Sequence, residues 1–158
     1  MSKVSTNKVP LTKGFTLMEI LVVIGIIAIL AAIVIVAINP SRQFAQARNS
    51  QRESNVSTIL NAIGQNIADN KGTFTCTGVT IATSPATSTI GASGADLGAS
   101  TCLVPTYIPS SIPFDPDGGT ANDTLYTVSK DSLGRYTVCA PKHQETALSG
   151  SAPYCLTR

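Results

Sequence analysis

The chain has 158 residues and a mass of 16.4 kDa, which predicts one structural unit and leaves little room for separate cofactor and substrate lobes. Charged residues make up only 13% and hydrophobic residues 43%, which excludes a disordered protein of the highly charged class. The net charge is +2, and the eleven Lys and Arg are spread along the chain. They form no basic stripe, so the composition does not indicate a nucleic-acid ligand.

A long apolar segment is the first predicted element. Residues 20–38 contain no polar or charged side chain, and as a helix they would extend roughly 28 Å, close to the hydrocarbon thickness of a bilayer. The apolar region of an ordinary secretory signal is shorter, so a membrane helix is the better interpretation. The positive-inside rule does not give its orientation, because three basic residues lie on each side: Lys3, Lys8 and Lys13 before it, and Arg42, Arg48 and Arg52 after it.

The four cysteines all lie after the apolar segment, in a region rich in Ser and Thr: Cys76, Cys102, Cys139 and Cys155. Their even number predicts two disulfides formed in an oxidising compartment. A zinc site is the competing interpretation, but the sequence has no C-x-x-C pair and a single histidine, His143. Disulfides place the downstream region outside the cell, which puts residues 1–14 in the cytoplasm.

The junction before the apolar segment carries a family resemblance. Residues 13–19 read Lys-Gly-Phe-Thr-Leu-Met-Glu, after a short basic leader and directly before the apolar segment. This arrangement resembles the class III leader of type IV pilins and pseudopilins, with the match strongest over residues 10–70. The resemblance implies that a prepilin peptidase cleaves between Gly14 and Phe15 on the cytoplasmic face and that Phe15 is then N-methylated.

Glu19 is the fifth residue after the implied cut and lies at the edge of the apolar segment. An ionised carboxylate in hydrocarbon costs a few kcal/mol unless it is paired with a cation. Cleavage would create an amine at Phe15, and in a filament this amine could approach Glu19 of a neighbouring subunit. The hypothesis is that this pair sets the register of assembly. The alternative is that Glu19 only marks the interfacial end of a membrane helix.

A second helical region follows the apolar segment. Pro40 removes one helical hydrogen bond, so a kink or a short break is expected there. Beyond it, apolar residues recur at helical spacing and form one face, namely Val56, Ile59, Leu60, Ile63 and Ile67. Residues 70–72, Asn-Lys-Gly, predict the end of this amphipathic helix.

The remaining chain predicts a small β-rich head. Residues 73–101 are low in charge and rich in Ser and Thr, which suggests an irregular loop, either simply solvated or decorated with sugars. Residues 124–129 and 135–140 alternate in polarity around a Gly-containing turn, the pattern of an antiparallel hairpin. We expect Tyr126 and Tyr136 on these strands to face the helix and build a small core.

Four cysteines allow three disulfide connectivities. Pairing of Cys76 with Cys102 and of Cys139 with Cys155 is favoured because sequential pairs close compact loops. The second pair also resembles the carboxy-terminal disulfide loop of many pilins. Each bond is expected to contribute roughly 2 to 4 kcal/mol to the stability of a small head.

A turn-rich segment gathers oxygen ligands of the kind that Ca²⁺ prefers: Asp115, Asp117, Asn122 and Asp123. The Asp115-Pro116 pair before a strand resembles the calcium loop of some major pseudopilins of type II secretion. The alternative is a solvated turn built from residues that favour turns. No other cofactor is expected. No catalytic constellation is found, and His143 is expected in an exposed loop, so the chain is not predicted to be an enzyme.

The predicted fold is α+β, with a long N-terminal helix, apolar and then amphipathic, packed on a small antiparallel β-sheet head of the pilin-like kind. The expected segments are a cleaved leader at 1–14, an apolar transmembrane or filament-core helix at 15–39, its amphipathic continuation at 40–71 and a disulfide-stabilised head at 72–158.

The resemblance implies a structural subunit of a type IV pilus-like filament, used in adhesion, motility or DNA uptake. The precursor would cross the cytoplasmic membrane once, with its N-terminus inside and its head outside, and would then join an extracellular filament. Implied partners are copies of itself, other pilins, the prepilin peptidase and N-methyltransferase, and an inner-membrane platform with its ATPase. The alternatives are a pseudopilin of a type II secretion or competence apparatus, favoured by the Asp115-Pro116 segment, and a bitopic surface-binding domain that never polymerises.

Overall fold

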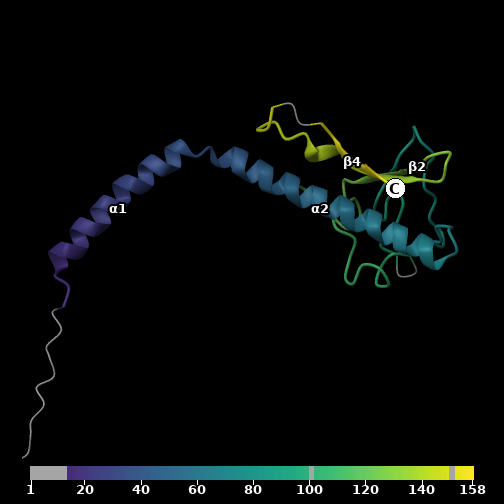
Figure 1. Cartoon of the computed structure of the whole chain (residues 1–158), viewed down its shortest axis with the longest axis horizontal. Helices are drawn as coiled ribbons and strands as arrows, with labels where there is room; N and C mark the ends of the chain where they lie inside the picture. Colours follow the sequence, from purple (N-terminus) through teal and green to yellow (C-terminus); the bar gives the residue numbers. More distant parts are fainter. Residues whose placement is uncertain (1–13, 100–101, 150–151) are drawn as a thin grey trace, which may run out of the picture. The chain divides into compact units, whose positions relative to one another are not determined.

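The structure is a computed structural model, which describes residues 14–99, 102–149 and 152–158 (Figure 1). The chain divides into two compact units, Met1–Pro40 and Ser41–Arg158. Each unit has its own architecture. The fold class is α+β, as the sequence predicts, with two helices followed by a small antiparallel sheet.

The first unit contains the apolar helix α1, Leu17–Ala37. The helix ends where Ile38 adopts an extended backbone, with φ −94° and ψ 123°, while its N–H still donates to the Val34 carbonyl at 3.0 Å. Pro40 is then the first residue of the next helix. The residue before a proline avoids the helical region, and proline suits the first helical position, so local sterics account for a break between the two helices.

The second helix, α2, spans Pro40–Asp69. The predicted apolar face is correct, since Val56, Ile59, Leu60 and Ile63 are at most 2% exposed and Ile67 packs against the same core. The helix ends within one residue of the predicted stop. There, Lys71 and Gly72 both adopt positive φ, and the Gly72 N–H donates to the Ile67 carbonyl at 2.8 Å, which satisfies one of the last free carbonyls of the helix.

The sheet has four antiparallel strands in the order β1-β2-β3-β4, and α2 lies against it (Figure 1). These strands are β1, Ser88–Thr89; β2, Thr127–Lys130; β3, Tyr136–Ala140; and β4, Tyr154–Thr157. The predicted hairpin is β2 and β3, in which Val128 pairs with Val138. A short 3₁₀ helix, Pro141–His143, follows β3. The edge strands β1 and β4 were not predicted.

Strand β2 begins three residues later than predicted, because the chain first makes a tight turn. Leu125 has a positive φ of 61°, and its N–H donates to the Asp123 carboxylate at 2.9 Å. Thr124 is buried, and its hydroxyl donates to the Ile90 carbonyl at 2.7 Å. This turn occupies residues 124–126, which alternation in polarity had assigned to the beginning of the strand.

The core of the second unit combines the apolar face of α2 with the inner face of the sheet. Tyr126, Val128 and Val138 are fully buried, and Tyr136 packs against the Phe74 ring at 5.5 Å between centroids. Tyr126 and Tyr136 therefore contribute to the core, as expected. Burying such aromatic side chains is a large share of what stabilises a head of this size.

The segment at 73–99 is irregular over most of its length, but it is more than a solvated loop. Its apolar residues Ile90, Ala95 and Leu97 are at most 1% exposed and belong to the same core as α2 and the sheet. The loop is therefore held in place by burial at these three positions, whereas most of its Ser and Thr residues precede them in the chain.

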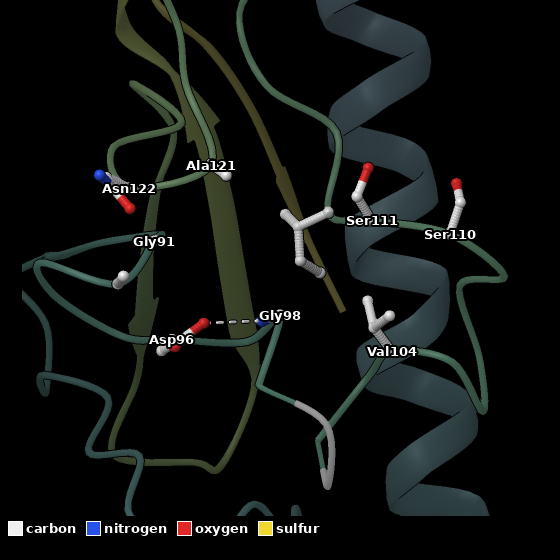
Figure 2. Close-up of a pocket in the computed structure, with 10 residues that line it drawn as sticks. Gly91, Asp96, Gly98, Val104, Ser110, Ser111, Ala121 and Asn122 are labelled. Carbon is white, nitrogen blue, oxygen red and sulfur yellow. Dashed lines mark hydrogen bonds between the residues drawn. The ribbon is translucent and has the colours of Figure 1, made fainter.

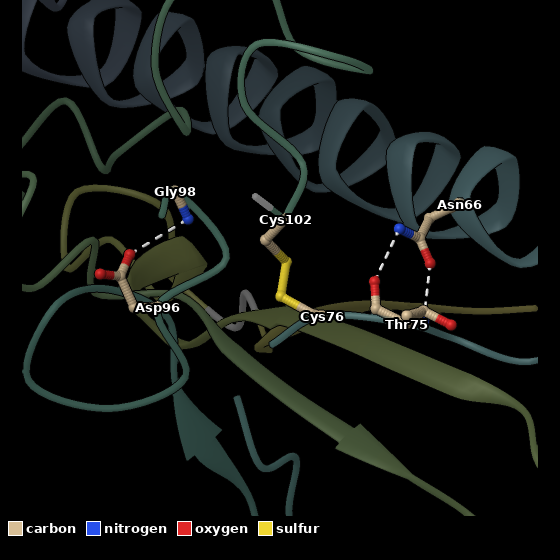
Figure 3. The surroundings of a disulfide bond; sticks show 6 residues. All are labelled: Asn66, Thr75, Cys76, Asp96, Gly98 and Cys102. Atoms are coloured by element: carbon tan, nitrogen blue, oxygen red, sulfur yellow. Dashed lines mark hydrogen bonds between the residues drawn. A yellow bond between two sulfur atoms is a disulfide. The ribbon is translucent and has the colours of Figure 1, made fainter. Parts of the chain in front are cut away.

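Two disulfides fasten the head, Cys76–Cys102 and Cys139–Cys155, the pairing that the sequence analysis favoured. The second joins directly opposed residues of β3 and β4. The first lies next to a contact with α2, in which Asn66 makes two hydrogen bonds to the backbone of Thr75 (Figure 3). Both bonds reduce the entropy of the unfolded chain, which matters in a domain with a small core.

Candidate processing and assembly site

The candidate site begins in the short non-helical segment before α1. Thr16 is the N-cap of this helix, and its hydroxyl accepts a hydrogen bond from the Glu19 N–H at 3.2 Å. This bond satisfies one of the free donors at the helix start, where a carboxylate is also favourable. Thr16 had no role in the predicted site, although a Thr followed three residues later by Glu is the pattern of a capping box.

The residues predicted for processing, Gly14 and Phe15, and for assembly, Glu19, lie close together. Gly14, Phe15 and Glu19 line one shallow surface depression with Thr16. The bond between Gly14 and Phe15 is in exposed, non-helical backbone, the kind of segment that a peptidase can bind. The remainder of the predicted leader, residues 1–13, lies outside the described residues.

Helix α1 supplies a surface that must be covered by something apolar. It has 21 residues with a mean hydropathy of 3.5 in its most apolar window, and in the described part of the chain it is the one helix long and apolar enough to cross a membrane. None of its side chains is buried, and Val36 and Leu17 are more than 80% exposed. A helix that is apolar on every side is stable in lipid or among other helices, not in water.

A buried ion network on α2 holds two loops of the head. The Arg52 guanidinium donates to both carboxylate oxygens of Asp115, at 2.7 and 2.9 Å, and to Glu145 at 2.5 Å. Glu145 also accepts two hydrogen bonds from Arg48, at 2.7 and 2.9 Å. The network thus fixes the segments around residues 115 and 145 to the first half of α2. Sequence spacing gives no sign of it, because its members are far apart in the chain.

These contacts shift pKa values in opposite directions. The hydrogen bond from Arg48 is the largest influence on Glu145, and together with Arg52 it outweighs burial and lowers the Glu145 pKa to about 2. Burial is the largest influence on Arg52 and acts to lower its pKa, but the hydrogen bonds to Asp115 and Glu145 raise it above its ordinary value. Glu145 and Arg52 therefore stay charged near neutral pH, and the network stabilises the fold.

The residues expected to bind Ca²⁺ are placed as follows. Asp115 is buried with both carboxylate oxygens on Arg52, and its Oδ1 also accepts from the Asp117 N–H at 2.8 Å. Asp117 is exposed beside Lys142, and Asp123 accepts from the Leu125 N–H. Asn122 is exposed on the surface. Across residues 14–99, 102–149 and 152–158, no three His, Cys, Asp or Glu side chains gather closely enough to hold a metal ion.

His143 ends the 3₁₀ helix, and its side chain is mostly buried instead of lying in an exposed loop. Its Nε2 lies 3.2 Å from Glu53 on α2, its Nδ1 lies 3.1 Å from the Ala152 carbonyl, and its ring packs near Tyr154. The histidine thus helps to hold the carboxy-terminal disulfide loop to α2.

Comparison with family models gives a match that coincides with the candidate site. Residues 11–35 match the model of the prokaryotic N-terminal methylation motif. No curated protein and no solved structure matches the chain. The matched segment contains Gly14, Phe15 and Glu19 and most of α1. This match supports the resemblance of the segment to the leaders of type IV pilins and pseudopilins.

Proposed function

We propose that the chain is the structural subunit of a type IV pilus-like filament, used in adhesion, motility or DNA uptake. Its precursor is inserted in the cytoplasmic membrane with the N-terminus inside, is cleaved between Gly14 and Phe15 and is methylated at Phe15. The mature subunit then polymerises with α1 in the filament core and the disulfide-stabilised head outside.

The observation that carries this proposal is the helix directly behind the methylation motif. It is long enough to cross a bilayer, and within the described residues none of its side chains is buried against the rest of the chain. Lipid can cover it in the precursor and neighbouring helices in a filament. A domain that served only as a bitopic receptor would need the membrane helix, but would have no use for processing at Gly14.

Glu19 supplies a means of assembly. It lies in the first turn of α1, four residues after Phe15, with its backbone fixed by Thr16. In an apolar bundle, its carboxylate would be stabilised by the amine of a neighbouring subunit, and leaving either charge unpaired would be costly. The pair therefore favours one register of neighbouring helices over the others.

The location and processed state of the native protein test the proposal. Intact-mass and N-terminal analysis would be made on sheared extracellular material and on washed membranes from the same cells. We expect a species that begins at methylated Phe15 and is abundant in the sheared fraction. The same species confined to membranes would favour a pseudopilin, and an uncut chain in both fractions would overturn the proposal.

A variant pair tests the assembly step. Glu19→Gln keeps the size of the side chain and removes its charge, so we expect normal insertion and cleavage but loss of filaments from the sheared fraction. Asp117→Asn is the control, because it removes the charge of an exposed carboxylate on the head, outside α1. Filaments at the normal level from Glu19→Gln would show that the carboxylate has no part in assembly.

A pseudopilin role remains the second candidate. The Asp115-Pro116 segment suggested it through the resemblance to a calcium loop. In the structure both oxygens of Asp115 are engaged by Arg52, which weakens that reason. The distribution between sheared and membrane fractions therefore distinguishes the two candidates better than calcium binding does.

A further inference from the structure

The single histidine of the chain joins three segments of the head. His143 ends the 3₁₀ helix, and its side chain is 16% exposed. Its Nε2 lies 3.2 Å from Oε1 of Glu53 on α2, and its Nδ1 lies 3.1 Å from the carbonyl oxygen of Ala152, just before β4. We call this pair of contacts the histidine bridge.

The neighbouring contacts hold the ring in this place. The His143 carbonyl accepts hydrogen bonds from the Asn49 side-chain amide at 3.1 Å and from the Glu145 N–H at 3.0 Å. The imidazole also packs near the Tyr154 ring of β4, with 5.5 Å between the two centroids. The ring is therefore positioned between its two oxygen neighbours by contacts that do not depend on its own charge.

Both atoms that face the ring nitrogens are hydrogen-bond acceptors. An ionised carboxylate and a carbonyl oxygen can only accept, whereas a neutral imidazole has one N–H and one lone pair. A neutral His143 can therefore bond to only one of them, and its bare nitrogen would face the other oxygen. The imidazolium form has two N–H groups and satisfies both acceptors, and its bond to Glu53 is assisted by charge.

The other charged groups around the bridge have partners of their own. On α2, Arg48 and Arg52 are bonded to Glu145, whose carboxylate is ionised near neutral pH. Next to the histidine, Lys142 donates to the Asp117 carbonyl at 2.6 Å. The histidine is also the one side chain in the sequence whose ordinary titration lies between pH 5 and 8. A change of pH in that range therefore acts on the bridge through the imidazole.

A pocket on the head shows a different arrangement of its titratable group. The pocket has a volume of about 240 Å³ and opens between the loop at 91–98 and the segment at 104–112 (Figure 2). Asp96, the titratable residue that lines it, accepts from the Gly98 N–H at 3.2 Å within one loop. A change in the charge of Asp96 would therefore not alter this link between neighbouring segments, as it does at the bridge.

We propose that the histidine bridge is a pH-controlled link between α2 and the start of β4. The link is complete when His143 is protonated, and it loses one of its two bonds as the pH rises and the ring becomes neutral. The Cys139–Cys155 disulfide and the bonds of Glu145 to α2 remain, so the change is confined to this contact and the head stays folded. The proposal does not depend on filament assembly, because the whole bridge belongs to the second compact unit.

A double-mutant cycle at two pH values tests the link. The full-length chain in detergent, its Glu53→Ala and His143→Ala variants and the double variant would be unfolded in denaturant at pH 5.5 and at pH 8.5. Both values lie above the ordinary titration range of glutamate. We expect the two side chains to be coupled by about fivefold in the unfolding equilibrium constant at pH 5.5, and by less than about twofold at pH 8.5.

Glu53→Gln is the matched variant, because an amide can accept from the imidazolium and can also donate to the bare nitrogen of the neutral ring. In this background the effect of His143→Ala on the unfolding equilibrium constant should be the same at both pH values, whereas in the parent chain it should be larger at pH 5.5. The ion pair of Asp131 and Arg135, 2.7 Å apart in the hairpin turn, is the control, and its coupling should not change with pH.

NMR of the ring nitrogens checks the two bonds in the parent chain itself. Because the chain has a single histidine, isotope-labelled histidine gives one assigned ring. Both ring N–H protons should be protected from solvent and visible at pH 5.5, and one should be lost at pH 8.5. The proposal is overturned if the coupling is absent at pH 5.5 or equal at both pH values, if Glu53→Gln keeps the pH dependence of the parent chain, or if fewer than two ring N–H protons are seen at pH 5.5.

Discussion

Arg52 on α2 and Asp115 in the following loop region form a fully buried pair joined by two hydrogen bonds, although 63 residues separate them in the chain. Arg52 has both Asp115 and Glu145 as counter-charges, so removing Asp115 leaves the buried guanidinium with one of its two carboxylate partners. Gly119 allows this loop to close, since a Cβ there would lie 2.5 Å from the backbone nitrogen of Asp115.

The first prediction concerns the loss of that pair. Asp115→Asn should lower the free energy of unfolding by about 2 kcal/mol, because the buried Arg52 would lose its charge-assisted hydrogen bonds to one of its two carboxylate partners and keep only Glu145. Denaturant unfolding of the full-length chain in detergent, followed by near-ultraviolet circular dichroism of its tyrosines, would measure this. Asp117→Asn, two residues away and exposed, is the control and should leave stability unchanged. An equal effect of both variants would contradict the prediction.

The second prediction concerns pH. The Glu145 pKa lies at about 2 in the folded protein and at an ordinary value of 4.5 in the unfolded chain. Because the folded value is the lower one, this contribution to stability is complete above pH 4.5 and is lost as the pH falls towards 2. The difference in unfolding free energy between the parent chain and Glu145→Gln should therefore be constant from pH 7 to pH 5 and shrink below that. A difference that stayed the same at pH 2.5 would argue against the assigned contacts.

The third prediction concerns the carboxy-terminal disulfide. Replacing Cys139 and Cys155 together by serine should cost about 3 kcal/mol, as expected for a loop of this length. The disulfide between Cys76 and Cys102 closes a longer loop. If chain entropy dominates, replacing both of its cysteines by serine should cost roughly a few tenths of a kcal/mol more. Thermal unfolding of both double variants would rank them, and limited proteolysis should cut the first variant after β3. Resistance of that segment to protease would show that the contacts of His143 and Glu145 hold it without the disulfide.

The fourth prediction concerns calcium. Asp115 makes a complete set of contacts with Arg52, so a cation would have to displace a buried guanidinium to use it. Adding millimolar Ca²⁺ or removing it with a chelator should leave the melting temperature unchanged. Stabilisation by mass action, which a bound ion would produce, is the outcome that would restore the calcium hypothesis.

The parts of the fold that follow from local pattern could be predicted from the sequence. The spacing of Val56, Ile59, Leu60 and Ile63 defines the buried face of α2, because helical periodicity places them on one side. The hairpin follows in the same way from alternation around its turn. Both patterns depend on neighbours in the chain, which a single sequence contains.

The contacts between distant residues could not be predicted. Asn49, Arg52, Asn55 and Asn66 are buried on the same face of α2, where their polarity alone would assign them to solvent. Each is buried because a partner from another segment satisfies it, such as Tyr126, whose hydroxyl accepts from the Asn55 amide at 2.9 Å. Whether such a polar residue is buried therefore depends on its hydrogen-bond partner in another segment. A single sequence does not identify that partner.

The position of Asn66 fits an amide side chain but not a carboxylate of the same size. Its amide donates to the Thr75 carbonyl at 3.0 Å and accepts from the Thr75 N–H at 2.9 Å, so the side chain bonds as a peptide unit would. Aspartate has the same shape but carries a second acceptor where the amide has its donor, and two oxygens would then face each other. At this point the fold distinguishes two side chains of equal size by a single atom, directly beside the residue whose sulfur joins Cys102 (Figure 3).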